Sequence, residues 1–222
     1  MIFDHVNHEI ELPKLTRKTT EKGRRYFTPE GKAYPSITTV LSILNKDKIQ
    51  EWRKKVGEDQ ANRISQQAAT RGTAVHSIAE DYLNNKDTSS YLPHIQQSFI
   101  NIKKILDEHI TKIYGLEVPL YSRHLGLAGR CDCVGVYDGV PTIIDFKTSK
   151  RVKKAEDISN YFAQMSAYAI MWEERTGMPI VNTVIIMDVD NDLPIVFKNH
   201  RDNYTELLLD TIKEYKRRKL FR

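Results

Sequence analysis

Apolar side chains recur at helical spacing through the middle of the first half of the chain. The pattern predicts helices at residues 37–45, 48–69, 72–85 and 93–109. In the last of these, Ile95, Phe99, Ile102 and Leu106 share one face. Residues 1–36 instead read as short strands and turns, with a hairpin around residues 29–32.

Beyond residue 110 the period changes to that of strands. Residues 113–121, 127–137 and 141–147 read as three strands, followed by a helix at 157–176 that Gly177 and Pro179 end. Two more strands, 181–187 and 193–197, precede a last helix from about residue 202. The order β-β-β-α-β-β-α predicts an α/β fold with a central mixed sheet flanked by helices, behind a helical N-terminal portion. We expect one domain over residues 1–222, with a hairpin and helices at 1–110 and an α/β core at 111–222.

Composition adds a mild preference for a polyanionic partner. The 34 Lys and Arg residues exceed the 29 Asp and Glu residues, which gives a net charge of +5. The two cysteines, Cys131 and Cys133, are too few for an iron–sulfur cluster or a zinc site and too close for a useful disulfide. They favour a reduced, intracellular setting.

The N-terminus shows no secretory signal, because an acid, Asp4, comes early and no apolar stretch follows. The longest apolar runs are too short to span a bilayer. We therefore expect a soluble, cytoplasmic protein.

One hairpin carries the chemistry. Asp138-Gly139 is a strong two-residue turn, and it pairs Tyr137 with Val140. In that register Asp132 and Asp145 lie directly opposite each other, with Cβ atoms roughly 5 Å apart. Opposed like charges destabilise a sheet unless a cation lies between them, and hard carboxylate ligands suit Mg²⁺ or Mn²⁺.

Lys147 follows Asp145 by two residues and shares its face, where an ammonium group could orient or activate a water. The opposite face is expected to carry Cys131, Cys133, Ile144 and Phe146, so the cysteines read as core residues. The alternative is a half-exposed hairpin with solvated charges. Ile143, which shares the face of both aspartates, argues against that alternative.

The spacing of Asp132 from Asp145-Phe146-Lys147 resembles the D…(D/E)-x-K signature of PD-(D/E)XK nucleases. Three further segments sharpen the resemblance. Arg71-Gly72-Thr73-Ala74-Val75-His76 resembles the upstream motif of RecB-like exonucleases, and Gln164-Met165-Ser166-Ala167-Tyr168 resembles their Q-x-x-x-Y motif. Residues 34–41 resemble a segment near the start of mitochondrial genome maintenance exonucleases and related phage exonucleases. The cluster-binding cysteines of CRISPR-associated members and a mitochondrial presequence are both missing, which favours a bacterial or phage member.

The resemblance implies a restriction-endonuclease-like core and a metal-dependent DNA nuclease. Asp132, Asp145 and the main-chain carbonyl of Phe146 would bind Mg²⁺ or Mn²⁺, and His76 would supply a further ligand. Lys147 would position the attacking water and stabilise developing negative charge. Taken alone, His76 reads as a satisfied interior histidine, and only the motif around it favours a ligand.

Several other residues have two interpretations each. Glu80 follows His76 by four residues and either holds its ring or is a surface carboxylate. Glu117 is either another acidic ligand or a solvated strand position. Gln164 and Tyr168 share a helical face and contact DNA or belong to an ordinary core stripe.

Cations and hydroxyls around the hairpin suggest DNA contacts. Position beside the expected site favours phosphate contacts for Arg71, Ser149, Lys150 and Arg151. The basic run at residues 216–219 is either a solvated helix end or a weak contributor to the electrostatic attraction of DNA.

Four functions remain open at this point. The relatives favour an exonuclease that degrades DNA from an end and prefers single strands. The same hairpin would serve an endonuclease that cuts internally or at junctions. The complete Asp/Asp/Lys/His set argues against a non-catalytic DNA-binding module. The sequence motifs of other hydrolase classes do not occur, which argues against an unrelated hydrolase. The sequence does not decide the polarity of cleavage, the choice of DNA over RNA or the number of metal ions. It also leaves open the oligomeric state and whether the pathway is replication, repair or recombination.

Overall fold

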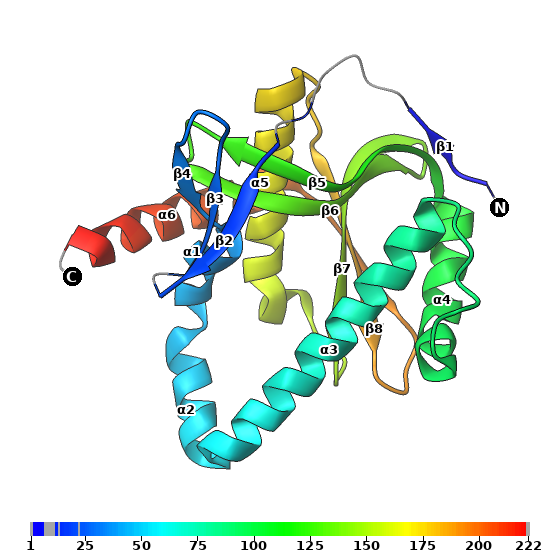
Figure 1. Ribbon diagram of the computed structural model, residues 1–222, viewed down its shortest axis with the longest axis horizontal. Helices are drawn as coiled ribbons and strands as arrows, with labels where there is room; N and C mark the ends of the chain where they lie inside the picture. The colour runs from blue at the N-terminus through cyan, green and yellow to red at the C-terminus, as the bar shows by residue number, and fades with distance from the viewer. Residues whose placement is uncertain (1, 7–11, 13, 22, 221–222) are drawn as a thin grey trace.

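A mixed sheet of six strands forms the centre of the computed structural model, which describes residues 2–6, 12, 14–21 and 23–220 (Figure 1). In spatial order its strands are β1 (Asp4–His5), β5 (Ile110–Ser122), β6 (Leu127–Tyr137), β7 (Val140–Ser149), β8 (Asn182–Val189) and β9 (Ile195–His200). The pairs β1–β5 and β7–β8 are parallel, and the other neighbours are antiparallel. The expected mixed sheet is confirmed.

Helices cover both faces of this sheet. They are α1 (Ile37–Leu41), α2 (Lys46–Val56), α3 (Glu58–Leu83), α4 (Pro93–His109), α5 (Ser159–Thr176) and α6 (Thr205–Leu220). Short 3₁₀ turns, η1 (Ser42–Leu44), η2 (Ala155–Ile158) and η3 (Arg201–Tyr204), lead out of α1 and into α5 and α6. The predicted order of elements from β5 onwards is confirmed.

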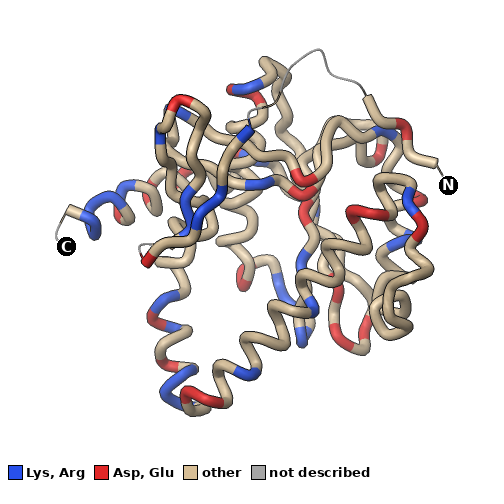
Figure 2. Tube along the Cα trace, in the orientation of Figure 1, with Lys and Arg blue, Asp and Glu red and all other residues tan. Residues whose placement is uncertain are grey.

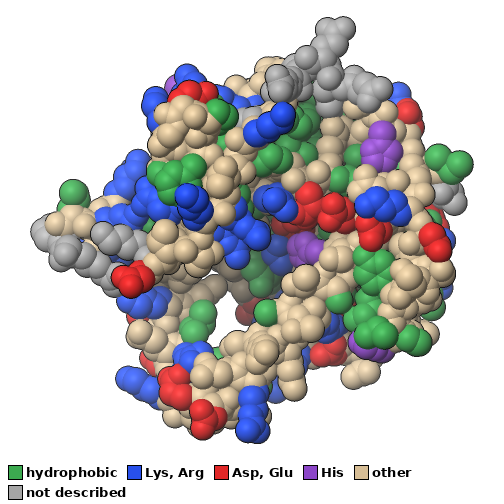
Figure 3. Space-filling view, viewed as in Figure 1, with side chains coloured by type: hydrophobic (Ala, Val, Ile, Leu, Met, Phe, Trp, Pro, Cys, Tyr) green, Lys and Arg blue, Asp and Glu red, His purple; other side chains and the backbone are tan. Residues whose placement is uncertain are grey.

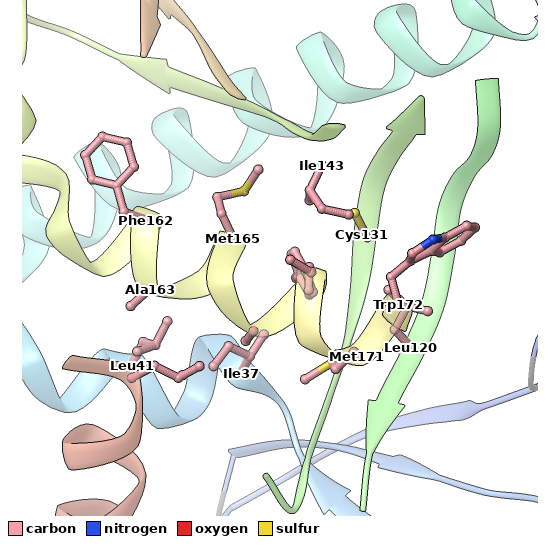
Figure 4. Close-up of a cluster of buried hydrophobic side chains, with 14 of the residues drawn as sticks. Ile37, Leu41, Leu120, Cys131, Ile143, Phe162, Ala163, Met165, Met171 and Trp172 are labelled. Atoms are coloured by element: carbon pink, nitrogen blue, oxygen red, sulfur yellow. The ribbon is translucent and has the colours of Figure 1, made fainter. Parts of the chain in front are cut away.

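Alternate residues of the inner strands enter two separate cores. Ile143 and Ile185 join the core formed with α1, α5 and α6, part of which Figure 4 shows around Phe162, Met165 and Trp172. Their neighbours in sequence, Ile144 and Ile186, join the core formed with α3 and α4. A strand that is covered on both faces must be apolar at successive positions, which explains the continuous apolar run along β8.

The boundary between the second and third helices lies earlier than predicted. The helix pattern suggested a break at residues 70–71, but α3 runs unbroken from Glu58 to Leu83 and the break falls at Gly57. Gly57 has φ of 85°, a conformation that ends α2 and that residues with a Cβ rarely adopt. As a result α2 and α3 form a V beside the sheet (Figure 1).

The two cysteines are buried, as expected, but on opposite faces rather than one. Cys131 belongs to the core on the α5 side and Cys133 to the core on the α3 side. On the neighbouring strand β5, Glu117 lies opposite Asp132 and has φ of 49°, so the backbone is irregular at this point. Asp132, between the cysteines, faces β7 and accepts a hydrogen bond from its backbone.

The strands β6 and β7 part at the position of the aspartates. Their pairing follows the predicted register from Tyr137–Val140 as far as Cys133–Ile144 and stops there. Beyond that point β6 continues only with β5, and β7 only with β8 (Figure 1). Asp132 and Asp145 are the first residues past the last pair, so they flank a fork instead of forming the direct pair that we predicted. Opposed carboxylates disfavour continued pairing at this point.

A second, three-stranded sheet lies over the open end of the fork. It consists of β2 (Thr16–Thr20), β3 (Gly23–Phe27) and β4 (Ala33–Pro35), with the expected hairpin between β3 and β4. A bridge between Ser36 and Ala128 joins its end to β6. Among the described residues, no helix combines the length and apolar character needed to cross a membrane.

Candidate active site

The fork opens into a pocket of about 600 Å³ between α3, α5 and the small sheet. Acidic positions meet where β5 and β6 part from β7, and basic positions run along β2 and β3 beside them (Figure 2). The pocket is lined by four acids, four bases and a group of polar and aromatic side chains, among them Glu80, Glu117, Asp132, Asp145, Arg17, Arg24, Arg130, Lys147, His76, Gln164 and Tyr168. The structure therefore brings together most of the residues that the sequence singled out.

The two aspartates at the fork are both largely removed from solvent. The side chain of Asp145 is 1% exposed and that of Asp132 is 11% exposed. The backbone N–H of Phe146, which lies beyond the end of the β6–β7 ladder, donates to Asp132 Oδ2 at 2.9 Å. Burial, reinforced by the charge of Asp145, raises the pKa of Asp132 well above its usual value.

Lys147 supplies the balancing cation on the α5 side. Its ammonium forms an ion pair with Asp145 and lies 5.2 Å from the centre of the Tyr161 ring. Burial lowers the pKa of Lys147, but the charges of Asp145 and Asp132 outweigh burial and leave that pKa above its usual value. Lys147 therefore remains a charged hydrogen-bond donor at neutral pH.

His76 reaches the same carboxylates from α3. Its Nδ1 lies 3.2 Å from Asp132 Oδ2. Burial lowers the pKa of His76, which favours the neutral ring that a metal ion requires. One ligand atom each from His76, Glu117 and Asp132 lie within 4.8 Å of one another. Glu117, which the sequence left undecided, is thus placed with the ligand candidates.

These groups fit a divalent cation. Asp145 Oδ1 is buried and has no hydrogen-bond partner among the described residues. A buried carboxylate oxygen without a partner is costly, and a cation would satisfy it. Carboxylates with one imidazole form a donor set that suits Mg²⁺ or Mn²⁺.

Gln164 and Tyr168 lie on α5 at the floor of the pocket. The Gln164 amide donates to the Tyr168 hydroxyl at 2.9 Å, and both side chains are at least nine-tenths buried. Burial and the nearby aspartates raise the pKa of Tyr168 well above its usual value, so its hydroxyl stays protonated. Tyr168 packs in the core on the α5 side, and both residues line the pocket, so the contact with DNA stays a prediction.

Of two other predicted residues on α3, one lines the pocket and one lies outside it. Glu80 lines the pocket one turn beyond His76, whose Nδ1 has Asp132 as its partner. Arg71 lies outside the pocket, where it forms ion pairs with Asp188 and, at 2.6 Å, with Asp190. These pairs anchor α3 to the end of β8.

The segment after β7 also lies outside this pocket. The Ser149 hydroxyl donates to the Arg151 carbonyl at 2.7 Å, so it closes a turn. Ser149 and Lys150 line a neighbouring hollow instead, and Arg151 is exposed.

The sequence analysis missed several residues of the pocket. Arg17, Arg24 and Arg130 form a basic rim, and Tyr161 extends the aromatic wall. Arg130 lies two residues before Asp132, and Tyr161 lies three residues before Gln164 on one helical face, so spacing alone could have indicated both. Arg17 and Arg24 carry no such signal, because their position depends on where the small sheet packs.

Replacing Gly129 by alanine should destabilise the protein. A Cβ at Gly129 would lie 2.6 Å from Cε1 of Tyr168 and 3.0 Å from Cγ2 of Ile37, with no space to accommodate it. We expect the free energy of unfolding to fall by about 1–3 kcal/mol, measured by urea denaturation.

Gly72→Ala is the matched control for that substitution. Gly72 lies within α3, and the nearest atom to an added Cβ is Thr148 Oγ1 at an ordinary 3.7 Å. Alanine is the better helix former by about 1 kcal/mol, so the free energy of unfolding should rise or stay unchanged. A Gly129→Ala protein as stable as the parent would refute the packing seen around Tyr168.

Comparison with known proteins identifies a family that matches most of the chain. The sequence model of the PD-(D/E)XK nuclease superfamily matches residues 49–214. Mitochondrial genome maintenance exonuclease 1 of Homo sapiens is 24% identical over 129 residues, which are 54% of this chain and 38% of that protein. A solved structure of a candidate exonuclease from Eubacterium rectale is 16% identical, with a TM-score of 0.45, over 68% of this chain and 66% of its own. The chain thus spans less than two thirds of the length of either relative.

Proposed function

Because this chain belongs to the PD-(D/E)XK nuclease superfamily, we propose that it is a metal-dependent deoxyribonuclease that degrades single-stranded DNA from a free end. The observation that carries the proposal is the convergence of Asp132, Asp145, Lys147 and His76 in one pocket at the fork. The proposal takes residues 1–222 as one nuclease domain.

Asp132, Asp145 and the Phe146 carbonyl, joined by His76 and Glu117, are the groups that would hold Mg²⁺ or Mn²⁺. Such an ion, when bound, polarises the scissile phosphate and lowers the pKa of its water. The protein's part is to hold these oxygens in place before the substrate arrives, and for Asp132 the hydrogen bond from Phe146 N–H does this.

Lys147 would act as a cation and not as a base. Its raised pKa keeps it protonated, so its ammonium can orient a water and stabilise the negative charge that develops on the phosphate. The pair of Gln164 and Tyr168 would present polar groups to the strand from the floor of the pocket.

The basic rim supports DNA as the substrate. Arg17 and Arg24 project from the small sheet, and Arg130, held by Glu117 at 3.2 Å, stands at the mouth of the fork. Guanidinium groups bind phosphates in a bidentate manner, so the rim would position the backbone over the acidic floor. Walls on three sides favour one unpaired strand over a duplex, and the exonuclease named among the relatives favours cutting from an end.

The test compares linear and closed-circular single-stranded DNA of the same sequence, with Mg²⁺ or Mn²⁺. We expect the linear form alone to be consumed. Cutting of the circle would make the protein an endonuclease that uses the same groups. Binding of DNA without cutting, under either ion, would contradict catalysis and leave a DNA-binding module. The same assay with RNA decides the choice of nucleic acid.

A further inference from the structure

A second hollow, of about 520 Å³, lies beside the catalytic pocket between α2 and the segment that follows β7. Trp52 and Lys48 line it from α2, and Lys150 and Lys153 from the opposite side. Tyr161 lines both this hollow and the catalytic pocket, so the two are neighbours across one ring. In Figure 3 the acidic and basic side chains of the pocket lie above a hollow that α2 and α3 frame.

The lining of the second hollow combines an indole with cations. Within the part of the chain that the structure describes, Lys48, Lys150 and Lys153 lie in no ion pair. Two acids, Glu156 and Asp157, also line it, but the Asp157 carboxylate already accepts the backbone N–H of Lys154 at 3.1 Å. The free ammonium groups thus face a space with an aromatic wall.

We propose that this second hollow is a nucleotide subsite for the single strand that leaves the catalytic pocket. A base would stack on Trp52, and its flanking phosphates would contact Lys150 and Lys153. Stacking on an indole needs an exposed base face, so the occupant is an unpaired strand, and aromatic and basic groups in alternation are how proteins bind one. The inference rests on the proposed function, because it extends the path of the same substrate.

Intrinsic fluorescence tests the contact without any cutting. The chain has two tryptophans, and Trp172 is fully buried in the core on the α5 side, so a change on DNA binding reports Trp52. We expect oligothymidylate to quench the parent protein in EDTA, and an abasic oligomer of equal length to quench it much less.

Substitutions measure what the subsite contributes. Trp52→Ala should weaken binding of long oligothymidylates about tenfold, whereas Trp52→Phe keeps a stacking face and should weaken it less. The affinity for single-stranded DNA falls as salt is added. Replacing both Lys150 and Lys153 by alanine should weaken that dependence, so that the slope of log affinity against log salt becomes less negative by about 1.4. Lys104→Ala, which removes an exposed lysine from α4, should leave binding unchanged.

Kinetics separates this inference from the nuclease proposal. Trp52→Ala should raise KM for long oligonucleotides with kcat unchanged, and should have no effect on oligonucleotides too short to reach the second hollow. Unchanged binding and unchanged KM in Trp52→Ala, in a parent that cuts DNA, would overturn the subsite and leave the nuclease intact. Quenching by DNA in a parent that cuts nothing would support the subsite and reject catalysis.

Discussion

The Asp145→Asn protein is expected to fold and to bind DNA, and to lose nuclease activity by on the order of 10³-fold. The substitution keeps the shape of the side chain but removes the charge that pairs with Lys147 and that would hold the cation. Asp145 is 1% exposed and its Oδ1 has no partner, so neither solvent nor another described group can replace it. The measurement is the rate of digestion of linear single-stranded DNA at saturating Mn²⁺, with circular dichroism as a check on the fold.

Asp210→Asn is the matched control for the loss of a carboxylate. Asp210 lies on α6 with a side chain 62% exposed and forms an ion pair with Lys213, and its loss should leave the rate unchanged. An Asp145→Asn protein that digests DNA at the parental rate would show that the fork takes no part in catalysis.

The Lys147→Met substitution is expected to lower both activity and stability. Methionine fills a similar volume, so the main change is that the Asp145 carboxylate stays buried without its cation. Removal of one partner of a buried pair costs about 3–5 kcal/mol, and we expect the free energy of unfolding in EDTA to fall by that amount. The rate should fall by about 10²–10³-fold, because a charge that stabilises the transition state is lost.

A double variant and a metal titration separate these effects. Asp145→Asn together with Lys147→Met leaves no unpaired charge of this pair, so it should be more stable than the sum of the single losses predicts. Mn²⁺ should raise the melting temperature of Lys147→Met more than that of the parent, because it supplies the missing positive charge. Equal stability of parent and Lys147→Met in EDTA would show that the ion pair contributes nothing.

The strand pairing of the hairpin was predictable because its register is local. The turn at Asp138-Gly139 fixes the pairing of β6 with β7, and the structure keeps that pairing through Cys133–Ile144. The fork itself was not predictable from these two strands. The fork also involves the strands on either side. Glu117 of β5 has φ of 49° opposite Asp132, and β8 remains paired with β7 after β7 leaves β6.

The helices show a similar division between local and tertiary causes. Pro93 starts α4 and Gly177 ends α5 as predicted, because each acts on its own backbone. The break at Gly57 was missed because the helical pattern continues across it, although a glycine is the residue that most often ends a helix. Arg71 was expected to bind phosphate, yet the fold supplies Asp188 and Asp190 as its partners, and both lie more than a hundred residues away.

The fork divides the central sheet into two halves, β1-β5-β6 and β7-β8-β9. Among the described residues, the strands of the two halves pair only along the short ladder from Tyr137–Val140 to Cys133–Ile144, and the bond from Phe146 N–H to Asp132 crosses the fork beyond it. One half carries Asp132 and the other carries Asp145. The ladder joins the two halves at one end of the fork, and the two aspartates face each other across its open end. A cation held by both would fasten the halves together, so that loading of the site and stiffening of the whole sheet become a single, linked event.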